Sequence, residues 1–172
     1  KQTYDFTLRW IHFPLHPDTP DSGLTLEKLF LKSSTEIEIM KQRMSSLMAE
    51  EGLPYGNRTH TYNSRLAQEL AKYAESFEEG EVLNRKLFEA YFVEGLNLAD
   101  TDVLLDLAES SGLPREETEE AISKRRFMNE VDADWKRARE LGVRGVPTFV
   151  YGNRALVGAQ PYETMKQLVQ IK

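Results

Sequence analysis

The chain has 172 residues, with 22 Lys and Arg against 28 Asp and Glu, a net charge of -6 and no cysteine. A chain of this length can bury roughly two thirds of its unfolded surface, so it can form a sizeable core without cross-links. The lack of cysteine excludes disulfides, thiolate metal ligands and thiol nucleophiles within these residues. The acidic balance argues against nucleic acid as a partner, and no apolar run approaches the roughly 18 residues that a membrane span needs. We therefore expect neither nucleic acid nor a membrane among its partners.

An alternating pattern opens the chain, with apolar side chains at Tyr4, Phe6, Leu8 and Trp10 and polar residues between them. A period of two predicts a half-buried strand over residues 3–11. Three prolines follow, and together with the turn residues up to Gly23 they predict an extended connector.

From Leu24 to Leu141 the apolar residues recur at helical spacing, and turn residues divide this stretch into about six helices. Ser33 and Glu36 have the spacing of a capping box at the start of the second helix. The apolar stripe of that helix consists of Ile37, Met40, Met44, Leu47 and Met48. The charged residues between 115 and 140 predict a solvated helical face with one narrow apolar stripe.

After Gly142 the pattern returns to strands. Residues 148–151 and 154–157 flank Gly152-Asn153, a two-residue loop that is typical of an antiparallel hairpin. Tyr162, Met165 and Leu168 then space out a final helix. The pattern predicts an α/β chain in which residues 1–23 and 142–172 form a sheet domain. Residues 24–141 are inserted as a helical domain, whose last helix leads back to the sheet.

No residue pattern assigns a reaction by itself. His12 and His16 are four residues apart, but Pro14 lies between them and favours an extended chain. At about 3.3 Å per residue, the two side chains would then be about 13 Å apart, too far to share a zinc ion. We expect no metal site, and the chain contains no nucleotide-binding loop.

The bond between Val146 and Pro147 lies directly before a predicted strand. Proline has no N–H for the ladder, and at the first position of a strand it often reshapes the backbone, in some proteins through a cis bond. The alternative interpretation is a simple turn that leads into the strand.

Four segments together resemble the DsbA-like thioredoxin-fold family, and in particular its FrnE branch. They are Trp10 to Pro17, Leu87 to Gly95, Gly142 to Val150, and Gly158-Ala159-Gln160. The third is similar to the family's cis-proline loop and the strand that follows it, and the second to the signature of its helical insert. The chain departs from the family at Asn63-Ser64 and Ala67-Gln68, where Asn-Thr and Ala-His are usual. No role of that histidine is therefore carried over.

The resemblance implies an α/β, thioredoxin-like fold with a large inserted all-helical domain. It implies a thiol-disulfide oxidoreductase that exchanges dithiols and disulfides with protein or peptide substrates and needs no cofactor. Pro147 would be the cis-proline of the active site, facing a cleft between the sheet domain and the insert. Gly145, Val146 and Thr148 would bind substrate, and the backbone of Val146 would pair with the substrate strand.

In this family, a first strand and a Cys-x-x-Cys helix start precede the strand expected at residues 3–11. We therefore expect the active-site cysteines upstream of this chain. We also expect a slot between residues 3–11 and the hairpin, filled by upstream residues or by a second copy, which would make a homodimer. The expected location is the cytoplasm.

Two alternatives stay open. The first is a glutathione-dependent isomerase or transferase of similar fold, which needs no dithiol and can carry a serine at the start of the active-site helix. The second is a redox-silent module that binds peptides or acts as a scaffold. Cys-x-x-Cys upstream would favour disulfide exchange, whereas a lone serine would favour glutathione chemistry.

Overall fold

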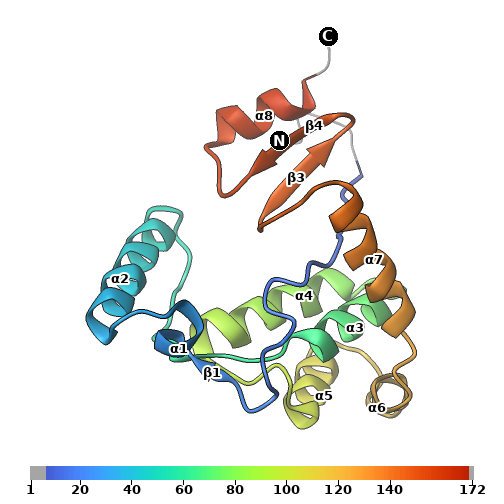
Figure 1. Cartoon of the computed structure of the whole chain (residues 1–172). Coiled ribbons are helices and arrows are strands. Elements are labelled where there is room, and N and C mark those ends of the chain that lie inside the picture. The colour runs from blue at the N-terminus through green and yellow to red at the C-terminus, as the bar shows by residue number, and fades with distance from the viewer. Residues whose placement is uncertain (1–6, 171–172) are drawn as a thin grey trace. The chain divides into compact units, whose positions relative to one another are not determined.

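The computed structural model describes residues 7–170, which form two compact units (Figure 1). One unit contains residues 16–131, and the other contains residues 7–15 together with residues 132–170. The sequence instead predicts boundaries after residue 23 and before residue 142. The end of the connector belongs to the helical unit because Thr19 is buried and Asn97 Nδ2 donates a hydrogen bond to the Asp21 carbonyl at 3.0 Å.

The core of the helical unit lies among α3 (Arg65–Ala74), α4 (Gly80–Glu89), the π-helix η1 (Ala90–Glu94), α5 (Thr101–Ser110) and α6 (Arg115–Ser123). Leu70, Leu83 and Leu104 are almost completely buried between these helices. Their helical spacing in the sequence places them on the inner faces. None of the helices in the described part of the chain is long and apolar enough to cross a bilayer.

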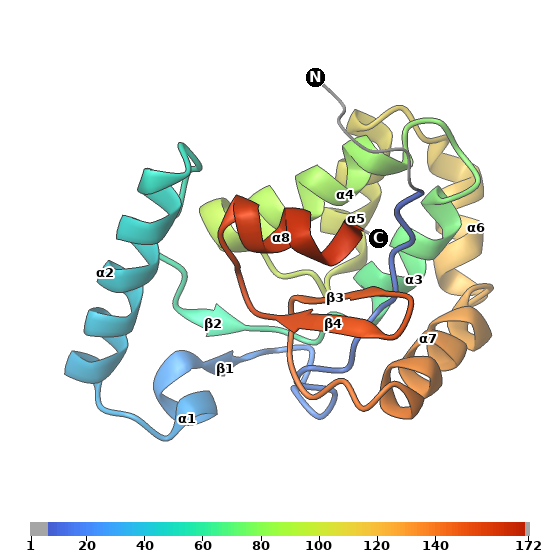
Figure 2. The ribbon, with the colours of Figure 1, turned by 90° about the horizontal axis from the view of Figure 1, so that it is seen from above.

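A small sheet and two helices precede this core. Strand β1 (Leu24–Thr25) pairs antiparallel with β2 (His60–Thr61), and α1 (Leu26–Phe30) follows β1 directly. The sequence predicts a loop where β2 lies, because two residues are too few to show alternation. In Figure 2, α2 (Ser34–Glu50) stands apart from the helices of the core.

Helix α2 begins where the capping box predicts, but most of its apolar stripe is exposed. Ser33 Oγ accepts a hydrogen bond from the Glu36 N–H at 3.3 Å, and Glu36 Oε2 accepts one from the Ser33 N–H at 3.0 Å, which completes the capping box. The apolar stripe does not join the core, however. Ile37 is 5% exposed, whereas Met40, Met44 and Leu47 are between 40% and 48% exposed. Capping is local, but burial of the stripe needs a partner surface.

The charged stretch between 115 and 140 is not one helix. It is divided into α6 and α7 (Met128–Glu140), and Arg125 between them has a φ of 50°. This left-handed conformation ends a helix without glycine, and Arg125 is held in place by Glu69 of α3. The sequence has no Gly or Pro at this point, so the break carries no local signal.

The other unit contains the predicted hairpin and final helix. Strands β3 (Thr148–Tyr151) and β4 (Arg154–Val157) pair antiparallel with Tyr151 opposite Arg154, and Gly152 has a φ of 61° in the turn. Helix α8 (Tyr162–Val169) packs against β4 (Figure 1). Leu168 of this helix is buried. Both strands have the residue limits that the sequence predicts, and the final helix contains the apolar residues expected for it.

The predicted strand over residues 3–11 is wrong for the part that the structure describes, and residues 3–6 lie outside the described residues. Residues 7–11 belong to no strand, and neither β3 nor β4 pairs with them. Leu8 and Trp10 are 59% and 48% exposed. Alternation produces a strand only where a neighbour completes the ladder. This segment is attached to α7 instead, since the His12 N–H donates to Asp134 Oδ2 at 3.0 Å.

Candidate functional site

The four predicted site residues lie in the loop between α7 and β3 and at the first position of β3. The C-terminus of α7 fixes where the loop begins. The Val143 N–H donates to the Ala138 carbonyl at 3.0 Å and the Gly142 N–H to the Arg139 carbonyl at 2.9 Å. This pattern closes a helix with a residue in the left-handed region, and Gly142 has a φ of 69°. Only glycine adopts this conformation without strain.

Two hydrogen bonds fix the remainder of the loop. Thr148 Oγ1 donates to the Gly145 carbonyl at 2.6 Å, and the Gly158 N–H donates to the Pro147 carbonyl at 2.8 Å. The bond between Val146 and Pro147 is cis, as the family resemblance implies. The structure therefore brings Gly145, Val146, Pro147 and Thr148 together in one closed turn at the start of β3.

Val146 presents both its side chain and its backbone at this turn. The side chain is 49% exposed. Among residues 7–170, no group forms a hydrogen bond with the Val146 N–H or carbonyl. Polar backbone groups normally find a partner in protein or water. An exposed apolar side chain next to free backbone groups is a surface on which an extended peptide can pair.

The open edge of β3 continues this surface. Tyr151 and Arg154 flank a two-residue turn, so they form a hydrogen-bonded pair, and such pairs alternate along an antiparallel ladder. The backbone groups of Thr148 and Val150 consequently point away from β4. Within the described part of the chain, no strand pairs with that edge. The turn at Val146 and this edge of β3 follow one another directly along the chain.

The loop carries little charge. Arg144 is the one charged residue between Gly142 and Tyr151 in the sequence, and its side chain is exposed. The described residues contain no group of three or more His, Asp or Glu side chains that could hold a metal ion. The loop therefore offers backbone polar groups and apolar side chains, and recognition through it would depend on main-chain pairing.

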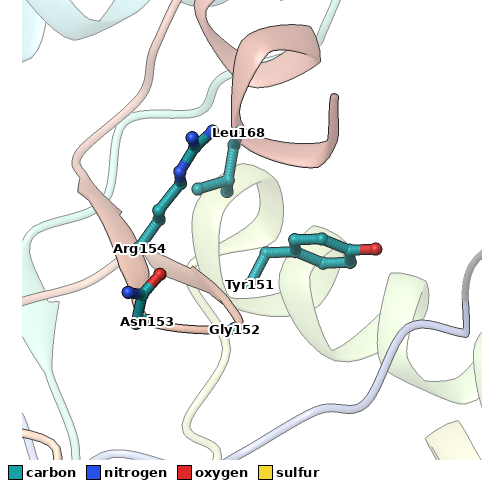
Figure 3. Close-up of a pocket in the computed structure, with 5 residues that line it drawn as sticks. All are labelled: Tyr151, Gly152, Asn153, Arg154 and Leu168. Carbon is teal, nitrogen blue, oxygen red and sulfur yellow. The ribbon is translucent and has the colours of Figure 1, made fainter. Parts of the chain in front are cut away.

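A shallow hollow of about 180 Å³ lies at the opposite end of the hairpin (Figure 3). Figure 3 shows the Arg154 side chain reaching towards α8, where its Nη1 donates to the Gln167 carbonyl at 3.4 Å. The hollow is lined by Tyr151, Gly152, Asn153, Arg154 and Leu168. The length of β3, roughly 13 Å for four residues, separates it from Pro147. The hollow is therefore not part of the loop site.

The DSBA-like thioredoxin domain is the family model that matches this chain, over residues 1–170. The chain belongs to the DsbA-like thioredoxin family. Its fold is accordingly α/β and thioredoxin-like, with the helical unit as an insertion. In this DsbA-like chain, the sequence resemblance assigns Pro147 to the active site and Gly145, Val146 and Thr148 to substrate binding.

Three relatives illustrate the family. YwbO, an uncharacterized protein of Bacillus subtilis (strain 168), is 30% identical over 111 residues, which cover 64% of this chain and 55% of YwbO. The chain thus spans about half the length of that relative. A probable DsbA oxidoreductase from Streptomyces coelicolor is 26% identical with a TM-score of 0.81, covering 89% of this chain and 69% of that one.

The third relative shares the fold. The cytosolic disulfide reductase DsbM from Pseudomonas aeruginosa is 23% identical with a TM-score of 0.53, covering 75% of this chain and 66% of that one. A structure of the same protein with GSH has a TM-score of 0.56 at 22% identity, covering 81% of this chain and 71% of that one. At 22–23% identity, this likeness shows a shared fold.

Proposed function

We propose that this chain is the substrate-binding part of a thiol-disulfide oxidoreductase that acts on protein or peptide substrates. Family membership supports the reaction class. None of the 172 residues is cysteine, so the thiol groups of the reaction come from residues outside this sequence. A thiolate would attack a substrate disulfide and form a mixed disulfide, which a second thiol resolves while the substrate is reduced.

One observation carries the proposal: the unpaired backbone of Val146 continues into the open edge of β3. A substrate peptide in an extended conformation would pair with Val146 and add a short strand beside Thr148 and Val150. Main-chain pairing is tolerant of side-chain identity, which suits an enzyme that accepts many protein disulfides. Pro147 has no N–H, so it places no donor of its own beside the reacting sulfur atoms.

The decisive variant is Val146→Pro, which removes the N–H that would pair with substrate. Val157→Pro is the matched control, because Val157 is 62% exposed and its N–H points to the outer edge of β4, away from β3. In the full-length protein, we expect Val146→Pro to raise the KM for insulin reduction about tenfold and Val157→Pro to change it little. Equal KM values for the two variants would contradict substrate pairing at Val146.

Glutathione separates this proposal from the open alternative. Reduction of insulin by the full-length protein without added glutathione supports dithiol exchange. Activity that requires glutathione would favour a glutathione-dependent isomerase or transferase, and no activity in either condition would favour a peptide-binding module. The proposal includes a cytoplasmic location, which is compatible with the cytosolic relative DsbM.

A further inference from the structure

The segment around Arg58 lies against the π-helix η1 within the helical unit. The Gly56 N–H donates to the Phe92 carbonyl at 3.0 Å, and a Cβ at Gly56 would lie 1.8 Å from the Val93 carbonyl oxygen. The two segments therefore approach each other as closely as glycine permits. π-Helical turns are found frequently at functional sites. This turn places two consecutive aromatic rings beside Arg58, whose guanidinium carbon lies 4.5 Å from the Tyr91 ring centre and 5.6 Å from that of Phe92.

Among the residues that the structure describes, Arg58 has only neutral partners. Its Nη1 donates to the His60 carbonyl at 3.0 Å, to Thr61 Oγ1 at 2.7 Å and to the Tyr91 hydroxyl. No carboxylate of residues 7–170 lies within 4.0 Å of the guanidinium, and its Nε atom is buried without an acceptor. Arg65 of the same unit, by contrast, pairs with Glu69 at 2.7 Å. A partly buried cation without a counter-charge is uncommon, and more so in an acidic chain.

The surroundings of Arg58 are polar and carry positive potential. Partial burial lowers the pKa of His16, and the positive charge of Arg58 lowers it further. The Thr59 hydroxyl lies 2.9 Å from His60 Nδ1, and the Tyr91 hydroxyl donates to Thr61 Oγ1 at 3.1 Å. Hydroxyl groups rotate, so these can turn to donate to a bound group. The Arg58 side chain is thus fixed in place, and its Nη2 atom has no acceptor among the described residues.

We propose that Arg58, together with the hydroxyls of Tyr91 and Thr61, binds a small oxyanion, either a carboxylate or a phosphate group. Guanidinium forms charge-assisted hydrogen bonds with both groups. The neutral partners orient the guanidinium group of Arg58 without neutralising its charge. The bound oxyanion would supply the missing negative charge. This site belongs to the helical unit and does not depend on the thiol-disulfide proposal for the loop at Pro147.

The 172-residue chain can be tested directly by NMR titration of its imidazole groups. Sodium phosphate and sodium acetate are added separately, with sodium chloride at equal ionic strength as the reference. We expect a saturable shift of the His16 and His60 signals and a higher pKa for His16, because a bound anion offsets the charge of Arg58. A response to phosphate alone identifies a phosphate site, and a response to acetate identifies a carboxylate site. A response no different from that of chloride would overturn the proposal.

Substitutions at Arg58 and Tyr91 test whether the anion binds at this site. Arg58→Gln should weaken binding about tenfold or more, and Arg58→Lys should retain part of it. Arg43→Gln is the matched control, because Arg43 is an exposed arginine of α2 that forms no ion pair with residues 7–170, and the variant loses the same charge. Should Arg58→Gln lose its native circular dichroism, Tyr91→Phe keeps the charge and should still weaken binding severalfold. Wild-type affinity in both Arg58→Gln and Tyr91→Phe would rule the site out.

Discussion

The carboxylate of Glu69 accepts two hydrogen bonds from Arg125, one from Nε to Oε2 and one from Nη2 to Oε1, each 2.7 Å long. Glu69 is 3% exposed in the middle of α3, and Arg125 is the residue with a φ of 50° between α6 and α7. Arg65 adds a third hydrogen bond to the same carboxylate at 2.7 Å. One buried acid therefore connects α3 to the turn that ends α6.

We expect Glu69→Gln to lower the free energy of unfolding by about 2 kcal/mol, because it leaves two guanidinium groups without their buried counter-charge. The cost is smaller than for a fully buried pair, since the Arg125 side chain is 42% exposed. Glu120→Gln is the control, because Glu120 forms its ion pairs with Lys124 and Arg126 on the surface. Urea denaturation of both variants checks the prediction. Equal midpoints would show that the buried ion pair contributes no more to the free energy of unfolding than the surface pairs do.

The pH dependence of stability tests the same group. Burial acts to raise the pKa of Glu69, but hydrogen bonds from Arg125 and Arg65, and the charges of both, outweigh it and lower the pKa. A lowered pKa in the folded state stabilises the protein above the unfolded value of about 4.3, and this contribution is lost as the pH falls through the folded pKa. The difference in unfolding free energy between wild type and Glu69→Gln should therefore be largest near pH 7 and shrink below pH 4. A difference that stays constant down to pH 3 would contradict this assignment.

Gly56 and Gly145 form a matched pair of glycines. A Cβ at Gly56 would collide with the backbone of Val93, whereas a Cβ at Gly145 would meet nothing within 4 Å. We expect Gly56→Ala to lower the free energy of unfolding by about 2–3 kcal/mol and Gly145→Ala to change it by less than about 0.5 kcal/mol. Thermal unfolding followed by circular dichroism measures both. A tolerated Gly56→Ala would show that the segment before Arg58 does not pack closely against η1.

The stripe of α2 gives a further prediction. Ile37 is 5% exposed and Met44 is 44% exposed on the same helix. Ile37→Ala should lower the free energy of unfolding by about 2–3 kcal/mol, because it removes buried methyl groups. Met44→Ala should change it by less than about 0.5 kcal/mol, since alanine has high helix propensity and little contact is lost. A large loss of stability in Met44→Ala would show that other residues cover the apolar stripe of α2 in solution.

The family resemblance predicts the position of the loop at Pro147. Which of its backbone groups are unpaired follows only from the structure. The residues from Gly145 to Thr148 stand next to one another in the sequence, so a motif locates them. The unpaired backbone of Val146 and the open edge of β3 depend on which strands are adjacent, and no local pattern encodes that. Arg58 was missed entirely, because its aromatic neighbours are more than thirty positions away in the chain.

The sequence alone determined the elements whose signals are local. The Gly152-Asn153 turn set the register of β3 and β4, Ser33 and Glu36 set the start of α2, and glycine at position 142 set the end of α7. Each signal acts within a few residues through backbone geometry or a short hydrogen bond, so tertiary contacts do not override it. Tertiary structure decided the rest. The pairing of Arg125 with Glu69 divided a helical stretch, and no strand of residues 7–170 pairs with residues 7–11. A pattern of apolar residues states what a segment is able to bury, and only the surfaces that the rest of the chain supplies determine what is buried.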